Sequence, residues 1–277
     1  MTRPFAAAAV LALSATTAAA QEAPFPVLRT AVEGLPDYTL YQPQGAGDAP
    51  LLIWGNGSCK ASNWQALSLL TALAADGHAI LAIGAPGSTD EERREIDPAR
   101  MTAAMDWAEG DGGAATLGGT PERIVTIGWS CGGVEAMLAG RDPRVDAVVG
   151  LATGLFLEED PMGRITFLVD ELDTLTAPLL IATGGVDDIA HANGVANYDY
   201  YDGPATLVTH ETAGHSGLVT GAYHSENVEV RSIDTTRRLV TDWLAWQLDG
   251  DADAEASFTA ANCDWCTAPW SARTKGF

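Results

Sequence analysis

The residues with the clearest chemical potential lie in the segment Gly128-Trp129-Ser130-Cys131-Gly132. An apolar, β-branched run over 124–127 precedes it and a helix-forming run over 134–139 follows it, which predicts a strand, a sharp turn and a helix. Glycines two residues to either side of a serine leave room for close contact between strand and helix. Such a turn lifts the hydroxyl out of the sheet, so Ser130 is a candidate nucleophile. The alternative is a glycine-rich turn in which the serine is incidental.

A serine nucleophile needs a base to accept its proton and an acid to orient that base. In folds with this kind of turn the three residues follow the chain order serine, acid, histidine. Among the five histidines, His215 follows the last predicted strand on a glycine-bearing loop, where the base is expected. His210, inside that strand, is the reserve candidate. The remaining histidines are expected to have other roles: His78, His191 and His224.

The acid is expected where the strand predicted at 178–182 ends. The run Gly184-Gly185-Val186-Asp187 has the usual Gly-x-x-Asp spacing, which favours Asp187. Asp188 is adjacent, and a shift of one residue in the loop would give it the role instead. The acid would hold one tautomer of the imidazole and stabilise its charged form. The other aspartate would then be a solvated or capping carboxylate.

Acyl chemistry also needs two hydrogen-bond donors that stabilise the developing oxyanion. One candidate is the backbone N–H of Cys131, which opens the helix after the nucleophile. The other is the backbone N–H of Ser58, in the loop after the first strand of the predicted parallel sheet. The alternative for this loop is an ordinary strand-to-helix turn.

The four cysteines are expected to form two disulfides. If the loops around residues 58 and 131 face each other, a Cys59–Cys131 disulfide would lock both oxyanion donors in place. The alternative is two small buried thiols. Cys263 and Cys266 lie away from any βαβ pattern and have no other metal ligand nearby, so we expect a structural disulfide rather than a zinc or redox site. No metal site is predicted.

These groups can be positioned only by a sheet whose strands alternate with helices. A hairpin is expected over 27–43, and apolar runs predict strands at 51–54, 78–83, 124–127, 145–151, 178–182 and 205–209. Helices are expected over 62–75, 98–109, 134–139 and 235–248, and loops over 84–97 and 111–119. The alternation predicts an α/β fold with a mostly parallel, doubly wound sheet. The interval between the strands at 145–151 and 178–182 is too short for a large lid, so an open cleft is expected.

The N-terminal residues suggest export. Residues 1–20 combine Arg3, a short apolar core and small residues before Gln21, which is typical of a secretory signal peptide. The apolar run is too short to span a bilayer. Residues 21–277 would then form a single catalytic domain in the periplasm or outside the cell. Asp and Glu number 37 against 15 Lys and Arg, a balance that disfavours nucleic acid and anionic membranes as partners.

The segment 128–133 resembles the nucleophile turn of secreted α/β-hydrolases of the dienelactone hydrolase and polyester hydrolase group, which includes cutinase-like and PET hydrolase-like enzymes. The run Asp-Asp-Ile-Ala at 187–190 is similar to the acid loop of the polyester hydrolases, which supports Asp187. A second group of secreted α/β-hydrolases, similar at 54–57 and 130–133, favours Asp188. Two departures are the cysteine at 131, where methionine is usual, and Asn-Gly-Ser at 56–58 in place of an aromatic clamp.

The resemblance implies the α/β-hydrolase fold, a serine carboxylic-ester hydrolase without metal or organic cofactor, and an ester substrate that is small or polymeric. Polyesters such as PET are one such class. Trp129 could border the substrate cleft, and its alternative is core packing. Two other functions stay open: a peptidase or acyltransferase on the same fold, and a catalytically silent binding protein. The oligomeric state is not predicted.

Overall fold

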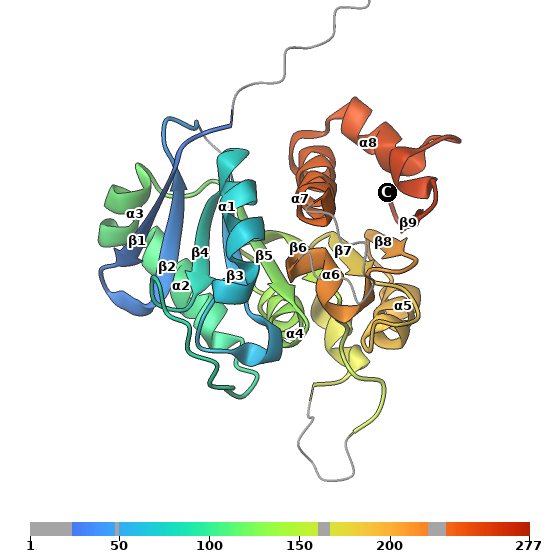
Figure 1. Ribbon diagram of the computed structural model, residues 1–277, viewed down its shortest axis with the longest axis horizontal. Helices are drawn as coiled ribbons and strands as arrows, with labels where there is room; N and C mark the ends of the chain where they lie inside the picture. Colours follow the sequence, from blue (N-terminus) through green and yellow to red (C-terminus); the bar gives the residue numbers. More distant parts are fainter. Residues whose placement is uncertain (1–23, 48–49, 160–166, 221–230) are drawn as a thin grey trace, which may run out of the picture.

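The computed structural model describes residues 24–47, 50–159, 167–220 and 231–277 (Figure 1). The proposed signal peptide and His224 lie outside these residues. The described residues form a nine-stranded sheet in the order β1-β2-β4-β3-β5-β6-β7-β8-β9. The strands are β1 (Val27–Val32), β2 (Leu35–Pro43), β3 (Leu51–Gly55), β4 (Ala79–Ile83), β5 (Ile124–Trp129), β6 (Val145–Leu151), β7 (Leu179–Thr183), β8 (Ala205–His210) and β9 (Trp270–Lys275).

The centre of the sheet is parallel and its edges are antiparallel. Strands β4, β3, β5, β6, β7 and β8 run in the same direction. The hairpin β1–β2 joins β4 in antiparallel register, and β9 joins β8 in the same way. The predicted hairpin and the mostly parallel sheet are therefore confirmed.

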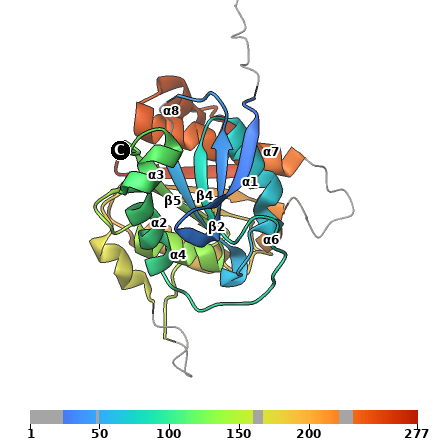
Figure 2. The same cartoon turned by 90° about the vertical axis from the view of Figure 1, so that its left-hand side faces the viewer.

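Helices cover both faces of this sheet. They are α1 (Leu67–Ala75), α2 (Ala99–Glu109), α3 (Asp111–Leu117), α4 (Cys131–Ala139), α5 (His191–Tyr200), α6 (Gly214–Thr220), α7 (Arg231–Leu244) and α8 (Ala252–Thr259). Short 3₁₀ segments are η1 (Gly57–Cys59), η2 (Trp64–Ala66), η3 (Val169–Thr174) and η5 (Asp264–Cys266), and η4 (Ala245–Asp249) is a π-helical turn. Figure 2 looks along the sheet from its β1–β2 side, with α1 and α6 on one face and α2 and α4 on the other.

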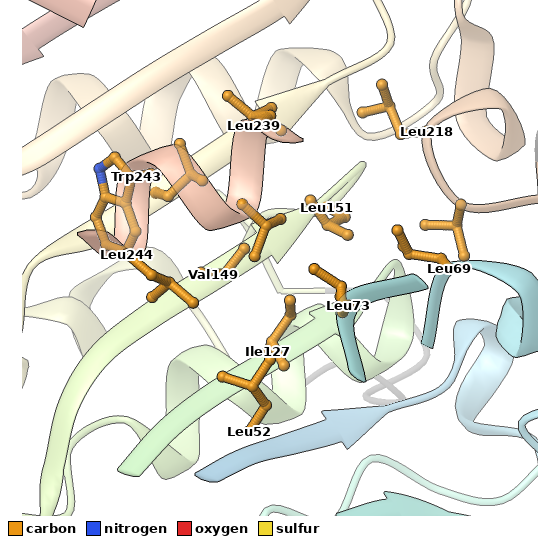
Figure 3. Close-up of a cluster of buried hydrophobic side chains, with 14 of the residues drawn as sticks. Leu52, Leu69, Leu73, Ile127, Val149, Leu151, Leu218, Leu239, Trp243 and Leu244 are labelled. Atoms are coloured by element: carbon orange, nitrogen blue, oxygen red, sulfur yellow. The ribbon is translucent and has the colours of Figure 1, made fainter. Parts of the chain in front are cut away.

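Strand periodicity divides the core into two layers. In β3, Leu52 and Trp54 pack into the layer under α1, α6 and α7, whereas Leu51 and Ile53 pack into the layer under α2 and α4. Because both faces are covered, the central strands are apolar throughout rather than alternating. Figure 3 shows the first layer, in which leucines of α1 and α7 meet the strand residues Ile127 and Val149.

Several predicted element boundaries were wrong. The strand at 205–210 is followed by a further strand, β9, whose polar sequence Trp-Ser-Ala-Arg-Thr-Lys has no apolar run because one of its edges is unpaired. Residues 111–117 form α3 rather than a loop, although they include two glycines. The helix expected from residue 62 begins as η2 and becomes α-helical only at Leu67. Tertiary contacts override weak local propensity at such positions.

The interval between β6 and β7 holds one short element, η3, among its described residues. Residues 160–166 of this interval lie outside the described part of the chain. Within the described ranges, no helix has the length and apolar character needed to cross a bilayer.

Candidate active site

The candidate chemical residues meet at the carboxyl edge of the parallel strands, the edge at which open α/β sheets bind ligands. Ser130 directly follows β5, Asp188 lies in the loop after β7, and His215 lies in the first turn of α6 after β8. His215 was expected on a loop, but Gly214 and His215 already belong to a helix. Three distant segments of the chain therefore supply one cluster.

The turn at Ser130 has the strained geometry that its sequence predicts. Ser130 has φ +53° and ψ −120°, a conformation that residues with a side chain rarely adopt. A Cβ atom at Gly128 would overlap the carbonyl of Gly132, and one at Gly132 would overlap the backbone of Gly55. The Thr153 hydroxyl donates to the Ser130 carbonyl at 2.7 Å. Close packing on three sides thus holds the hydroxyl-bearing residue in place.

A chain of hydrogen bonds joins the three side chains. His215 Nδ1 lies 2.6 Å from Asp188 Oδ1, and His215 Nε2 lies 2.9 Å from Ser130 Oγ. A carboxylate can only accept, so Nδ1 carries the proton and Nε2 is left as an acceptor. The Ser130 hydroxyl then donates to Nε2. This tautomer lets the imidazole take a proton from Ser130.

The structure brings Asp188, and not the favoured Asp187, against His215. Gly185 has φ +81°, and the Asp188 N–H donates to the Gly185 carbonyl at 2.9 Å, which closes a tight turn. Asp187 lies on the outside of this turn and is exposed, whereas the Asp188 side chain is fully buried. The preference for Asp187 was therefore wrong about which carboxylate reaches the imidazole.

The surroundings of Asp188 keep it charged. Burial by itself raises the pKa of this carboxyl group, but hydrogen bonds from His215, Gly184 N–H and Ala190 N–H outweigh burial, and the net pKa lies below its ordinary value. The two backbone bonds measure 3.0 and 2.9 Å. They use both carboxylate oxygens, so Asp188 faces His215 in a single orientation.

The two proposed oxyanion donors lie in adjoining loops that a disulfide connects. Cys59 is bonded to Cys131, with a Cα–Cα distance of 5.3 Å, which confirms the predicted pairing. Cys263 is bonded to Cys266, also as predicted. Among the described residues, the backbone N–H groups of Ser58 and Cys131 donate to no other group. Both donors are thus available to an external acceptor.

Sequence inspection missed Asn56 as the residue that fixes the loop of Ser58. Its carbonyl accepts from Gly132 N–H at 2.9 Å and from Cys59 N–H at 3.1 Å, which joins the loop to the nucleophile turn. Its buried amide donates to the carbonyls of Ile83 and Lys60 and accepts from the Trp54 indole. An asparagine directly after a buried strand was the available signal, since a buried amide must find several partners. Ser58 and Cys59 have φ +56° and +47°, so this loop is strained.

Trp129 is largely buried, packs against Gly57 and bonds to the backbone of His215. Only 7% of its surface is exposed, and its indole N–H donates to the His215 carbonyl at 2.9 Å. Its ring packs directly against Gly57, where a Cβ atom would overlap it. This burial favours core packing, the stated alternative, and the predicted substrate contact by this side chain stays a prediction.

The other described histidines form no hydrogen bond to Ser130. The His210 ring packs edge-on against Trp270, and its Nδ1 accepts from Thr212 N–H at 3.2 Å. His191 Nδ1 lies 3.0 Å from the Thr183 hydroxyl, and His78 is buried at the amino end of β4. His215 alone among the described histidines bonds to Ser130.

No family model matches the chain, and no curated protein matches it. Within the described residues, no group of three or more His, Cys, Asp or Glu side chains is arranged to hold a metal ion. The geometry of the site is therefore the basis for a functional assignment.

Proposed function

We propose that this protein is a secreted serine hydrolase of the α/β-hydrolase fold that cleaves carboxylic esters through an acyl-enzyme intermediate. The observation that carries the proposal is the hydrogen-bonded series Ser130–His215–Asp188 at the carboxyl edge of a mostly parallel sheet. The strained turn at Ser130 and the chain order serine, aspartate, histidine support the same fold. Similarity in fold alone would not support an activity, whereas this arrangement of side chains does.

In the proposed reaction, Ser130 Oγ attacks the ester carbonyl while His215 Nε2 accepts its proton. His215 then donates this proton to the alcohol that leaves, and a serine ester of the acid remains. Water, activated by the same imidazole, releases the acid and restores Ser130. Asp188 stays ionised throughout and stabilises the imidazolium.

Negative charge on the carbonyl oxygen develops where the N–H groups of Ser58 and Cys131 are proposed to donate. Such donors are effective because their orientation is set before the reaction begins. Here the disulfide between Cys59 and Cys131 and the bonds to the Asn56 carbonyl restrain both loops. The site therefore supplies the electrostatic part of catalysis from its backbone.

The surface beside the site favours bulky, apolar esters, including polyesters. Val186 and Ile189 flank Asp188 in the chain and are 84% and 83% exposed. These two exposed aliphatic side chains, so close in the chain to Asp188, are where the apolar part of such a substrate is proposed to make contact. The two disulfides are consistent with the proposed secretion.

The direct test combines covalent labelling with hydrolysis. The folded, oxidised protein should react with a fluorophosphonate probe at Ser130 and release acid from p-nitrophenyl esters, and Ser130→Ala should do neither. A matched panel of peptide substrates separates esterase from peptidase activity, and an alcohol acceptor reveals acyl transfer. Absence of labelling at Ser130 would refute the proposal and favour a silent binding protein.

A further inference from the structure

A hollow lies over the hairpin β1–β2, on the sheet face that carries α1. It has a volume of about 370 Å³, and its walls come from β1, β2, the start of α1 and residues 86–89 after β4. Trp64, Tyr41 and Arg29 contribute its larger side chains. Neither the proposed nucleophile nor its partners line this groove, so the catalytic proposal leaves it without a role.

Trp64 offers an aromatic face to the groove. Its side chain is 54% exposed, which is unusual for an indole of this size. The neighbouring Asn63 is buried, and its amide bonds to the Thr39 hydroxyl and to the carbonyls of Ile83 and Gly84. The backbone under Trp64 is therefore anchored. An exposed aromatic ring on an anchored backbone can stack against another planar ring.

Arg29 places an unneutralised positive charge in the same groove. It is the cross-strand partner of Tyr41 in the β1–β2 hairpin. Among the described residues it forms no ion pair, although Asp and Glu outnumber Lys and Arg by 37 to 15 in the chain. In this acidic protein most described arginines do have carboxylate partners, for example Arg123 with Asp249 and Arg273 with Asp199. The groove is thus complementary to an anion from outside.

The strand order gives the spacing between this groove and the strand that precedes Ser130 within the plane of the sheet. Strand β2 lies three positions from β5 in the sheet, and β1 lies four positions from it. At the usual strand spacing these lateral separations are about 14 and 19 Å. The segment η2, which carries Trp64, contacts α6, which carries His215. Trp64 therefore lies on a segment that adjoins the helix of His215.

We propose that this groove is a remote subsite for the acid end of an aromatic oligoester, with Trp64 stacking on an aryl ring and Arg29 pairing with the terminal carboxylate. The inference rests on the proposed esterase function, because it names the substrate end that lies beyond the scissile bond. A bidentate guanidinium–carboxylate pair would distinguish an oligomer with a free acid end from a neutral one.

The first test measures binding and needs no catalysis. Ser130→Ala protein is titrated calorimetrically with a dimeric benzenedicarboxylate glycol ester carrying one free carboxylate, and with the same dimer capped as its methyl ester. We expect the acid-ended dimer to bind about tenfold more tightly than the capped one. In the same Ser130→Ala background, Arg29→Gln should abolish the difference in affinity between the two dimers. Trp64→Ala should weaken the binding of both dimers. Arg93→Gln, which removes an exposed guanidinium outside the groove, is the matched control and should leave the ratio intact.

The second test measures catalysis in protein that retains Ser130. Arg29→Gln and Trp64→Ala should raise KM for the acid-ended dimer about tenfold and leave hydrolysis of p-nitrophenyl acetate within about twofold. An unchanged binding ratio in Arg29→Gln would overturn the subsite. Absence of any ester hydrolysis would instead refute the proposed function, and the binding titration would still decide the groove.

Discussion

A one-residue difference in the loop after β7 decides which carboxylate can act in the proposed mechanism. Asp187 and Asp188 are adjacent in the chain and carry the same side chain. The turn from Gly185 to Asp188 buries the second aspartate and exposes the first. Only Asp188 then fixes the His215 proton on Nδ1 and leaves Nε2 free to accept from Ser130.

Replacement of each aspartate by asparagine tests this difference. Asp188→Asn should lower kcat about 10³- to 10⁴-fold on a p-nitrophenyl ester, because the amide can stabilise the wrong imidazole tautomer. Asp187→Asn, the matched control, should stay within about twofold of the parent. Steady-state kinetics at neutral pH measures both, and equal losses in the two variants would contradict the assignment.

A second residue-scale prediction concerns Glu135, which is buried in α4. One of its oxygens accepts from Asp97 N–H at 3.0 Å and from Arg100 at 3.3 Å. The other oxygen has no partner among the described residues. Burial raises the pKa of Glu135 to about 7, from an ordinary value of 4.5. The charges of Asp97 and Arg94 and the buried hydroxyl of Tyr38 complete the polar surroundings of this group.

This shift makes stability depend on pH. Between pH 4.5 and about 7 the native state holds a proton that the unfolded chain releases, so the free energy of unfolding falls as pH rises through this range. The contribution is at most about 3 kcal/mol. Glu135→Gln should remove this part of the pH dependence, as measured by urea unfolding at pH 4.5, 5.5 and 7.5. Parallel pH profiles for the parent and the variant would contradict the assignment.

At the scale of elements, the site is a junction between the loop after β3 and the start of α4. The Asn56 carbonyl, the packed glycines and the Cys59–Cys131 disulfide all join these two segments. Arg94 N–H also donates to the Cys59 carbonyl, so the loop that follows β4 braces the same turn. The junction keeps Ser58, Cys59 and Ser130 at positive φ.

Removal of the disulfide should therefore affect both stability and turnover. The double change Cys59→Ser and Cys131→Ser opens a crosslink with a sequence separation of 72, which corresponds to about 4 kcal/mol of unfolded-state entropy. We also expect kcat to fall more than KM rises, since the oxyanion donors lose their fixed orientation. Urea unfolding and ester kinetics measure the two effects.

The matched control is Cys263→Ser with Cys266→Ser. Its sequence separation is 3, so the entropic loss is about 2 kcal/mol, and kcat should not change. A kcat loss of equal size in both double variants would show that the disulfide near the site has no special role in orienting the donors.

At the scale of the whole molecule, a net charge of −22 acts against the compact state through self-repulsion. Salt screens this repulsion over a distance of about 10 Å at 0.1 M and less at higher concentration. We expect Tm at pH 7 to rise by about 2–6 °C between 0.05 and 1 M NaCl, which is roughly 1–2 kcal/mol. Calorimetry near pH 4.3, the isoelectric point of the sequence, provides the control, because the salt effect should shrink there. A salt response that is equal at both pH values would contradict the argument.

Much of the architecture follows from local patterns in the sequence. Short apolar runs alternating with helical periods predict a parallel sheet covered on both faces, because only a buried strand tolerates apolar residues at every position. The run Gly-Trp-Ser-Cys-Gly-Gly predicts the strained turn, since no residue larger than glycine fits at 128 and 132. The Cys59–Cys131 pairing was predicted from the same fold. It requires only that the loops around residues 58 and 131 lie at the same edge of the sheet.

Tertiary structure alone decided the remaining features. The chain does not encode locally that Asp188 turns inward, that Trp129 packs under Gly57, or that the polar segment 270–275 completes the sheet beside β8. Each of these outcomes depends on contacts between segments far apart in the sequence, and such contacts outweigh the small differences in local preference between neighbouring residues. The sequence by itself thus determined which residue types could do chemistry and at which edge of the sheet. The packing of distant segments determined which individual side chains meet there.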